Sequence, residues 1–134
     1  MSLLGEFRGE LDIRYVPHSG RTWVLLRPFT WCGPASNPVC YEVPAAFVTD
    51  FASIPRFIQA VLSPTHGVVS DYGRAAVIHD WLYRTGARAV PPITRKQADQ
   101  VFYDAMLCEN VLWPTRFMMW LAVRLFGWTA YRRA

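Results

Sequence analysis

Polar and apolar residues alternate in short runs through the first half of the chain, as they do in half-buried β-strands. Residues 10–16 alternate between polar and apolar, and a second β-prone run over 22–26 follows a turn-forming Pro-His-Ser-Gly stretch. Together the two runs predict a β-hairpin. A third strand is expected over 39–44, after a loop rich in Gly and Pro, and Pro44 either ends this strand or places it at a sheet edge.

The second half of the chain changes to helical spacing. Residues 56–62 are expected to form a short helix, because the preceding Ser-Ile-Pro offers a capping Ser and a Pro suited to a first helical position. A second helix is expected to begin at Ser70 or Asp71, either of which can cap it. This helix should run to about Arg84 and end at Gly86.

A third helix is expected after Thr94, whose hydroxyl can cap it. Five apolar residues recur there at helical spacing and define a buried stripe: Ala98, Val101, Phe102, Ala105 and Met106. The short Pro-Pro connection before Thr94 predicts that the second and third helices pack antiparallel. The pattern therefore predicts a single α+β domain over 1–134, mainly β over 1–50 and mainly α over 51–134, with three to four helices.

The segment 114–133 is strongly apolar but is interrupted by Arg116 and Arg124. It falls short of the roughly 20 apolar residues that a bilayer span needs, so no transmembrane helix is expected. The simpler interpretation is a closing helix packed on the core. The alternative is an interfacial helix, apolar on one side and Arg-bearing on the other, that contacts a lipid surface or a partner protein.

The composition indicates a folded domain with a surplus of aromatic residues. Apolar residues make up 52% of the chain and charged residues 18%, which excludes an intrinsically disordered protein. Six Trp and eight Phe are enough to cover an interface as well as a core. The formal charge of +4 is spread along the chain without a basic run, so nucleic acid is not an expected partner.

The three cysteines, Cys32, Cys40 and Cys108, are an odd number and lack Cys-x-x-Cys spacing. Neither a zinc site nor a disulfide framework is therefore indicated. Cys32 and Cys40 could bridge a loop, but the favoured interpretation is three reduced thiols in a protein made in the cytoplasm. The first residues show no signal-peptide pattern, so export by that route is not expected.

A His79-Asp80-x-x-Tyr83 sequence lies on the second predicted helix. His79 and Tyr83 share a helix face, whereas Asp80 is turned by about 100° from His79. Asp99 borders the buried stripe of the third helix, so antiparallel packing should bring it to His79. His79 is then a candidate general base with Asp99 as its orienting partner. A core histidine that bonds Asp99 for stability alone remains the alternative.

Two further aspartates suggest a cation site. Asp80, together with Asp50, could bind a hard cation such as calcium, which prefers carboxylate and carbonyl oxygens. However, Asp50 and Ser53 stand just before a predicted helix, and capping that helix is the favoured role for both.

Three other residues near the His-Asp sequence have open roles. Tyr83 either supports the site as a hydrogen-bond donor or only presents its ring to the core. Arg84 and Arg95 are each expected to be solvated or to pair with Asp80 or Asp104.

Three motifs occur in an order that resembles an uncharacterised family of tailed-phage and prophage proteins. They are Thr-Asp-x-Ala-Ser-Ile-Pro at 49–55, His-Asp-x-x-Tyr at 79–83 and Arg-x-x-Ala-Asp-x-x-Phe at 95–102. The resemblance extends from Glu10 to Gly127. It implies a phage protein that is made in the host cytoplasm and could be incorporated in the virion.

The helix pair alone is similar to the phospholipase A2 superfamily, which carries a His-Asp pair and a Tyr on one helix and an Asp on the antiparallel helix. This resemblance implies that His79 is the base that activates water and that Asp99 orients it. It also implies that Asp80 binds calcium and that Tyr83 donates a supporting hydrogen bond. The glycine-rich, cysteine-bearing calcium loop of that superfamily has no counterpart before His79.

Two functions are therefore expected. The first is a His-Asp ester hydrolase of phospholipase A2-like geometry that acts at the cell envelope on membrane lipid. The second is a non-enzymatic virion component of the tail, baseplate or head, or an assembly protein, in which the His and Asp cluster is structural and the aromatic surplus contacts other virion proteins.

Overall fold

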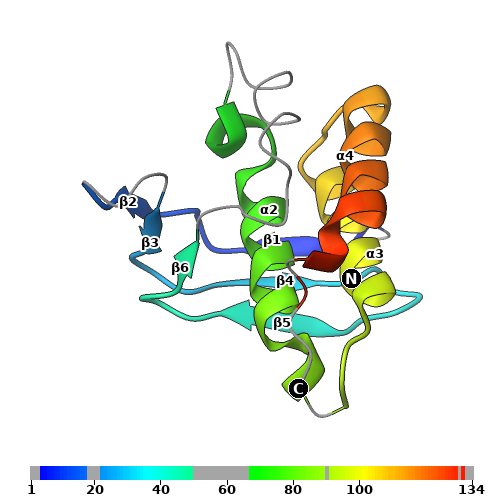
Figure 1. Ribbon diagram of the computed structural model, residues 1–134, viewed down its shortest axis with the longest axis horizontal. Coiled ribbons are helices and arrows are strands. Elements are labelled where there is room, and N and C mark those ends of the chain that lie inside the picture. Colours follow the sequence, from blue (N-terminus) through cyan, green and yellow to red (C-terminus); the bar gives the residue numbers. More distant parts are fainter. Residues whose placement is uncertain (1–3, 18–21, 50–66, 90, 130, 132–134) are drawn as a thin grey trace.

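The computed structural model describes residues 4–17, 22–49, 67–89, 91–129 and 131. Over these residues, six short strands form two three-stranded antiparallel sheets, and three α-helices follow. The predicted α+β class is therefore confirmed (Figure 1). The short helix expected over 56–62, and the residues Asp50 and Ser53, lie outside the described residues.

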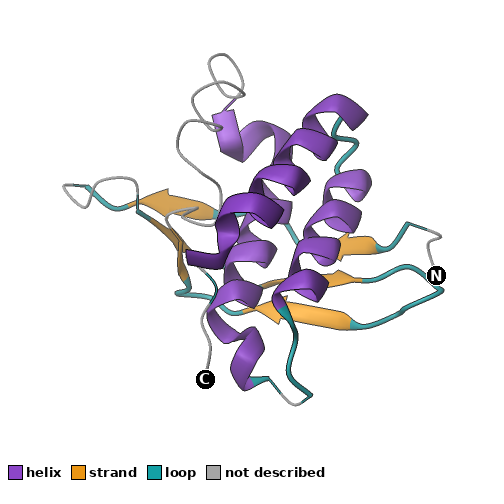
Figure 2. Cartoon of the chain, turned by 45° about the vertical axis from the view of Figure 1, so that its right-hand side comes forward, coloured by secondary structure: helices purple, strands orange, loops and turns teal. Residues whose placement is uncertain are grey.

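The first sheet carries the helices on one face. It consists of β1 (Glu6–Arg8), β4 (Phe29–Cys32) and β5 (Cys40–Val43), in the order β1-β4-β5. Because alternate residues of a strand point to the same face, Phe29 and Trp31 of β4 are buried together. Figure 2 shows the helices gathered on one side of this sheet.

The second sheet contains the predicted hairpin. It consists of β2 (Ile13–Tyr15), β3 (Trp23–Leu25) and β6 (Val48–Thr49), in the order β2-β3-β6. The antiparallel β2–β3 pair confirms the hairpin, and β5 confirms the strand that ends before Pro44. The strands β1, β4 and β6 are not predicted from the sequence pattern.

The three helices run antiparallel to their neighbours. They are α2 (Gly67–Thr85), α3 (Arg95–Cys108) and α4 (Trp113–Phe126). Short 3₁₀ turns follow α2 and α4: η1 (Gly86–Arg88) and η2 (Gly127–Thr129).

The beginning of α2 differs from the prediction, and its end agrees. The helix starts at Gly67, so Ser70 and Asp71 lie inside it and do not cap it. The predicted end at Gly86 is correct to one residue, because η1 begins there.

The start of α3 is fixed by a capping box. The Thr94 hydroxyl accepts a hydrogen bond from the Gln97 backbone N–H at 3.1 Å, and the Gln97 side chain accepts one from the Thr94 N–H at 2.9 Å. Both bonds satisfy backbone donors that a helix start otherwise leaves unpaired. All five residues of the predicted apolar stripe on α3 are buried, so the cap and the buried face are both confirmed.

Arg74 of α2 joins the N-terminal strand to the end of α3. Its guanidinium donates to the Gly9 carbonyl at 3.0 Å and forms two bonds to the Glu109 carboxylate, at 3.0 and 3.1 Å. It also lies 4.4 Å from the centre of the Phe7 ring, a cation–π distance. One side chain therefore ties together three segments that are distant in sequence.

The closing segment is a helix packed on the core. Met119, Ala122 and Val123 of α4 are buried, as the simpler interpretation predicts. Among the described residues, no helix is both long and apolar enough to cross a membrane.

The arginines of α4 do not form an outer charged face. Arg116 donates to the Val111 carbonyl and lies over the Tyr103 ring, and Arg124 reaches inward to Asp99. The alternative interpretation, an Arg-bearing outer side, does not agree with the structure, because both guanidinium groups find partners within the protein. What α4 exposes is apolar: Trp113, Phe117, Met118, Leu121, Leu125 and Phe126.

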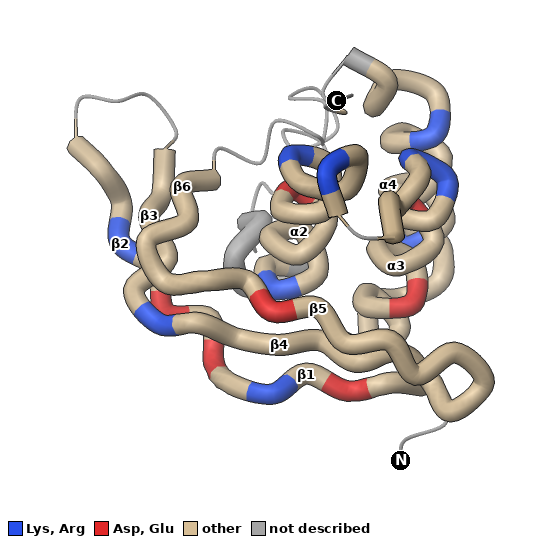
Figure 3. The backbone as a smooth tube through the Cα atoms, turned by 90° about the horizontal axis from the view of Figure 1, so that it is seen from below, with Lys and Arg blue, Asp and Glu red and all other residues tan. Residues whose placement is uncertain are grey.

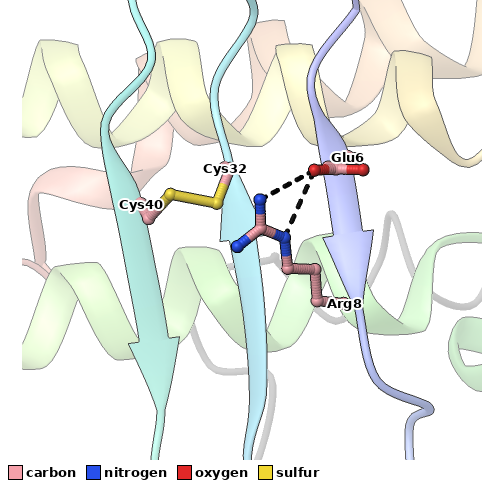
Figure 4. Close-up of a disulfide and its surroundings, with 4 residues drawn as sticks. All are labelled: Glu6, Arg8, Cys32 and Cys40. Carbon is pink, nitrogen blue, oxygen red and sulfur yellow. Dashed lines mark hydrogen bonds and ion pairs between the residues drawn. A yellow bond between two sulfur atoms is a disulfide. The ribbon is translucent and has the colours of Figure 1, made fainter. Parts of the chain in front are cut away.

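Cys32 and Cys40 form a disulfide, so the favoured interpretation of three reduced thiols is wrong (Figure 4). The physical reason is register: the two residues lie directly opposite each other in the β4–β5 pair, with Cα atoms 4.0 Å apart. Cys108 remains a free thiol, and burial raises its pKa.

Replacing Cys40 with Ala should lower the free energy of unfolding by about 2–3 kcal/mol, because the bridge restricts the unfolded chain around a short loop. Urea denaturation without reductant measures this difference. In reducing buffer the wild type also loses the bridge, so the two proteins should then unfold at similar urea concentrations. Equal stability of both proteins in oxidising buffer would contradict a stabilising role for the disulfide.

Candidate functional site

A buried carboxylate lies at the junction of the three helices. Asp99 of α3 is 0% exposed, as are His79 and Tyr83 of α2. The Nε2 atom of His79 lies 2.7 Å from Oδ1 of Asp99, and the Tyr83 hydroxyl donates to the same oxygen. The predicted contact between His79 and Asp99 is therefore confirmed, and Tyr83 takes part in it.

Arginines contact the other oxygen of Asp99. Nη1 of Arg124, from α4, lies 2.8 Å from Oδ2, and Nη1 of Arg95 lies 3.6 Å from it. Arg95 also donates to the carbonyls of Val123 and Arg124 at 3.0 and 3.2 Å, near the end of α4. Arg95 is expected from the sequence to be solvated or to pair with Asp80 or Asp104, and the structure pairs it with Asp99 instead.

These contacts set the charge state of the cluster. Burial by itself raises the pKa of Asp99, but hydrogen bonds from His79, Tyr83 and Arg124 outweigh burial and hold the pKa below its usual value. Burial and the neighbouring Asp99 raise the pKa of Tyr83, so its hydroxyl keeps its proton. An ionised carboxylate only accepts hydrogen bonds, so a neutral His79 carries its proton on Nε2 and leaves Nδ1 as the basic nitrogen.

Asp80 faces away from this cluster, toward the second sheet. Its Oδ2 accepts a hydrogen bond from the Thr49 hydroxyl of β6 at 2.5 Å, and its Oδ1 lies 3.4 Å from Nε of Arg84. Arg84 also donates to the Val48 carbonyl at 3.0 Å. The predicted Arg84–Asp80 pair is therefore confirmed, and it joins α2 to β6.

The described residues do not fit a calcium site. Both oxygens of Asp80 already contact protein groups, Thr49 and Arg84. Across the described ranges, no group of three or more His, Cys, Asp or Glu side chains could hold a metal ion. Asp50, the other predicted ligand, lies outside those ranges, as does Ser53.

The sequence interpretation assigned no contact to three residues in or beside the cluster. Arg124 is recognisable as a charge inside an apolar helix, but the sequence interpretation gives it no contact with Asp99 and places it on an outer face only in the alternative. Thr49 opens the 49–55 motif, but its hydrogen bond to Asp80 has no local signal, because it depends on the pairing of β6 with a distant strand. Gly127 permits close packing: a Cβ atom there would lie 2.5 Å from the Tyr83 hydroxyl oxygen.

The fold and the buried His-Asp pair thus define an α+β domain with one polar cluster between its helices. The chain belongs to the DUF1353 family, a family of proteins of unknown function, whose sequence model matches residues 23–123. The matched range includes His79, Asp80, Tyr83 and Asp99 and stops one residue before Arg124.

One curated relative is the Uncharacterized protein y4iH of Sinorhizobium fredii (strain NBRC 101917 / NGR234). It is 37% identical to the chain over 92 residues, which cover 68% of the chain and 35% of that protein. The chain therefore spans about a third of this relative's length. No solved structure shows significant similarity to the chain.

Replacing the fully buried Asp99 with Asn should destabilise the protein by about 3–5 kcal/mol, because it leaves the partly buried Arg95 and Arg124 without their counter-charge. The loss of stability at acid pH, called the acid limb, should change as well. The pKa of Asp99 is lowered in the folded state, so its contribution is complete above the unfolded pKa near 4 and is lost as pH falls through the folded pKa. Urea denaturation between pH 7 and pH 2 should show a shallower acid loss for the variant than for wild type.

The matched control is Asp12→Asn, which breaks the pair of a half-buried carboxylate with Arg27, whose side chain is 79% exposed. This change should cost less than about 1 kcal/mol. An Asp99→Asn protein as stable as the control, with an unchanged acid limb, would show that the cluster does not hold the helices together.

Proposed function

We propose that the chain is a His-Asp ester hydrolase in which His79 is the general base. The observation that carries the proposal is the 2.7 Å contact of Nε2 with Asp99, which sets the tautomer of His79 and makes Nδ1 its basic nitrogen. Tyr83, Arg95 and Arg124 hold Asp99 ionised and fixed in position. A base whose tautomer is set by a carboxylate is the arrangement that general base catalysis requires.

In the proposed reaction, Nδ1 of His79 takes a proton from a water molecule while the water oxygen attacks the ester carbonyl carbon. The bond from that carbon to the alkoxy oxygen then breaks, and the proton passes from His79 to the leaving alkoxide. The products are a carboxylic acid and an alcohol. Asp99 stabilises the imidazolium that forms between the two proton transfers, and Tyr83 and Arg124 keep Asp99 from turning.

The proposed setting is a phage or prophage protein that acts on membrane lipid at the cell envelope. The order of the three sequence motifs supports the phage origin. The resemblance of the helix pair to the phospholipase A2 superfamily supports an acyl ester of a phospholipid as the substrate. The exposed apolar residues of α4 support contact with a lipid surface. No step of the proposal uses calcium.

His79→Gln should reduce hydrolysis by about 10²- to 10⁴-fold, the usual contribution of a general base. The Gln side-chain nitrogen can replace Nε2 as the donor to Asp99, so the fold should be kept while the basic Nδ1 is lost. Fatty-acid release from phospholipid vesicles measures activity, and thermal unfolding checks the fold.

Tyr83→Phe is the matched control, because it removes one hydrogen bond to Asp99 and leaves the base. Its activity should lie between those of wild type and His79→Gln. If wild type and His79→Gln release fatty acid at the same rate, His79 is not a catalytic base.

A second function, a virion component or assembly protein without enzymatic activity, is favoured by two observations. His79 is 0% exposed, which suits a structural hydrogen bond to Asp99. The outer face of α4 exposes a row of apolar residues at helical spacing, Trp113, Phe117, Leu121 and Leu125, which is typical of a surface that a partner protein covers.

Leu121→Glu combined with Leu125→Glu should abolish association through α4 and should leave the thermal unfolding temperature nearly unchanged, because both side chains already face solvent. Sedimentation measures self-association, and flotation with phospholipid vesicles measures lipid contact. Leu26→Glu is the control, since Leu26 is similarly exposed at 43% but lies elsewhere. Unaltered sedimentation and flotation in the double variant would exclude α4 as the contact surface.

A further inference from the structure

A pocket of about 490 Å³ lies apart from the buried His79 and Asp99 cluster. It is bounded by the β4–β5 hairpin, by the loop that joins η1 to α3, and by one face of α3. Its volume falls within the range of small-molecule sites, about 300–1,000 Å³. None of the residues that line it belongs to the cluster, so the pocket is a separate site.

The walls of the pocket combine apolar and polar groups. Trp31 and Val101 form buried parts of the wall, and the half-buried Tyr41 adds an aromatic ring. The disulfide residue Cys40 also lines the pocket, so the crosslink between β4 and β5 stiffens this wall. Polar groups come from α3, where Gln100 donates a hydrogen bond to Asp104 at 3.0 Å.

Asp104 is the charged residue of this pocket. Among the described lining residues it alone carries a formal charge, and that charge is negative. Its side chain is half-buried, and burial raises its pKa while the hydrogen bond from Gln100 lowers it. The carboxylate is thus partly removed from water, and the hydrogen bond from the Gln100 amide replaces part of its lost hydration.

Asp104 differs from the other buried or half-buried carboxylates that the structure describes. Each of those pairs with an arginine: Asp12 with Arg27, Asp80 with Arg84, Asp99 with Arg124, and Glu109 with Arg74. Within the same part of the chain, no Arg or Lys lies within ion-pair distance of Asp104. Figure 3 shows basic and acidic positions interspersed along the strands and helices, so cations are available elsewhere in the fold.

We propose that this pocket binds a small organic cation, an ammonium or guanidinium group attached to an apolar body. The cationic group pairs with Asp104 and replaces the counter-ion that the protein supplies to its other buried carboxylates. The apolar body packs against Tyr41 and the proline-rich wall. Aromatic faces attract cations, so the ring adds to the preference that the carboxylate sets. The same carboxylate repels anionic ligands of equal size.

The test compares three probes of matched size: 2-phenylethylammonium, the neutral 2-phenylethanol and the anion 3-phenylpropanoate. Calorimetric titration of the whole protein should show the cation binding on the order of tenfold or more tightly than either other probe, as a charge-assisted hydrogen bond predicts. In Asp104→Asn the affinity for the cation should fall to that for the alcohol. Backbone amide shifts should change at Tyr41 and Gln100.

Glu42→Gln is the matched control, because it removes the same charge from an exposed residue that adjoins Tyr41 but does not line the pocket. This variant should bind the cation as wild type does. The proposal is overturned if the cation binds no tighter than the alcohol, or if Asp104→Asn binds the cation unchanged. Shifts confined to residues around His79 would also overturn it. The inference does not depend on hydrolase activity, so either proposal can fail while the other stands.

Discussion

The carboxylate of Asp99 is removed from water at the meeting point of three helices, and the arrangement of those helices depends on how its charge is compensated. Moving an ion into a protein interior costs several kcal/mol unless hydrogen bonds and opposite charges replace the lost water. His79 and Tyr83 supply bonds from α2, and Arg124 supplies positive charge from α4. Because each partner comes from a different direction, α2, α3 and α4 are held in one relative position.

Local properties of the sequence predict the elements that bury one face over several residues. Alternation predicts the β2–β3 hairpin, and cap chemistry predicts the start of α3 at Thr94. The strands β1 and β6 are not predicted in this way, because their positions depend on pairing with strands that are distant in sequence. The disulfide has the same origin: only the register of β4 against β5 places Cys32 opposite Cys40.

Some residues of the site can also be predicted from local sequence properties, and others cannot. The contact of His79 with Asp99 can be predicted, because helical spacing fixes the face of each residue and a short connection makes the helices antiparallel. The presence of Tyr83 in the cluster can also be predicted, because it lies four residues after His79 and shares its helix face. Arg124 cannot be predicted, because a charge in an apolar helix suits either an outer polar face or a buried counter-ion. The packing of α4 on α3 decides between these, and the sequence pattern of α4 contains no information about it.

The bridge made by Arg74 bears on the order in which the protein can fold during synthesis. The guanidinium contacts Gly9 on one side and Glu109 on the other, and the thiol of Cys108 donates to the Leu4 carbonyl. Domains generally fold as units, and a chain leaves the ribosome from its N-terminus. The N-terminal segment therefore cannot form its contacts with Arg74 and Cys108 until those residues have been synthesised. Its final contacts close the domain late rather than nucleate it.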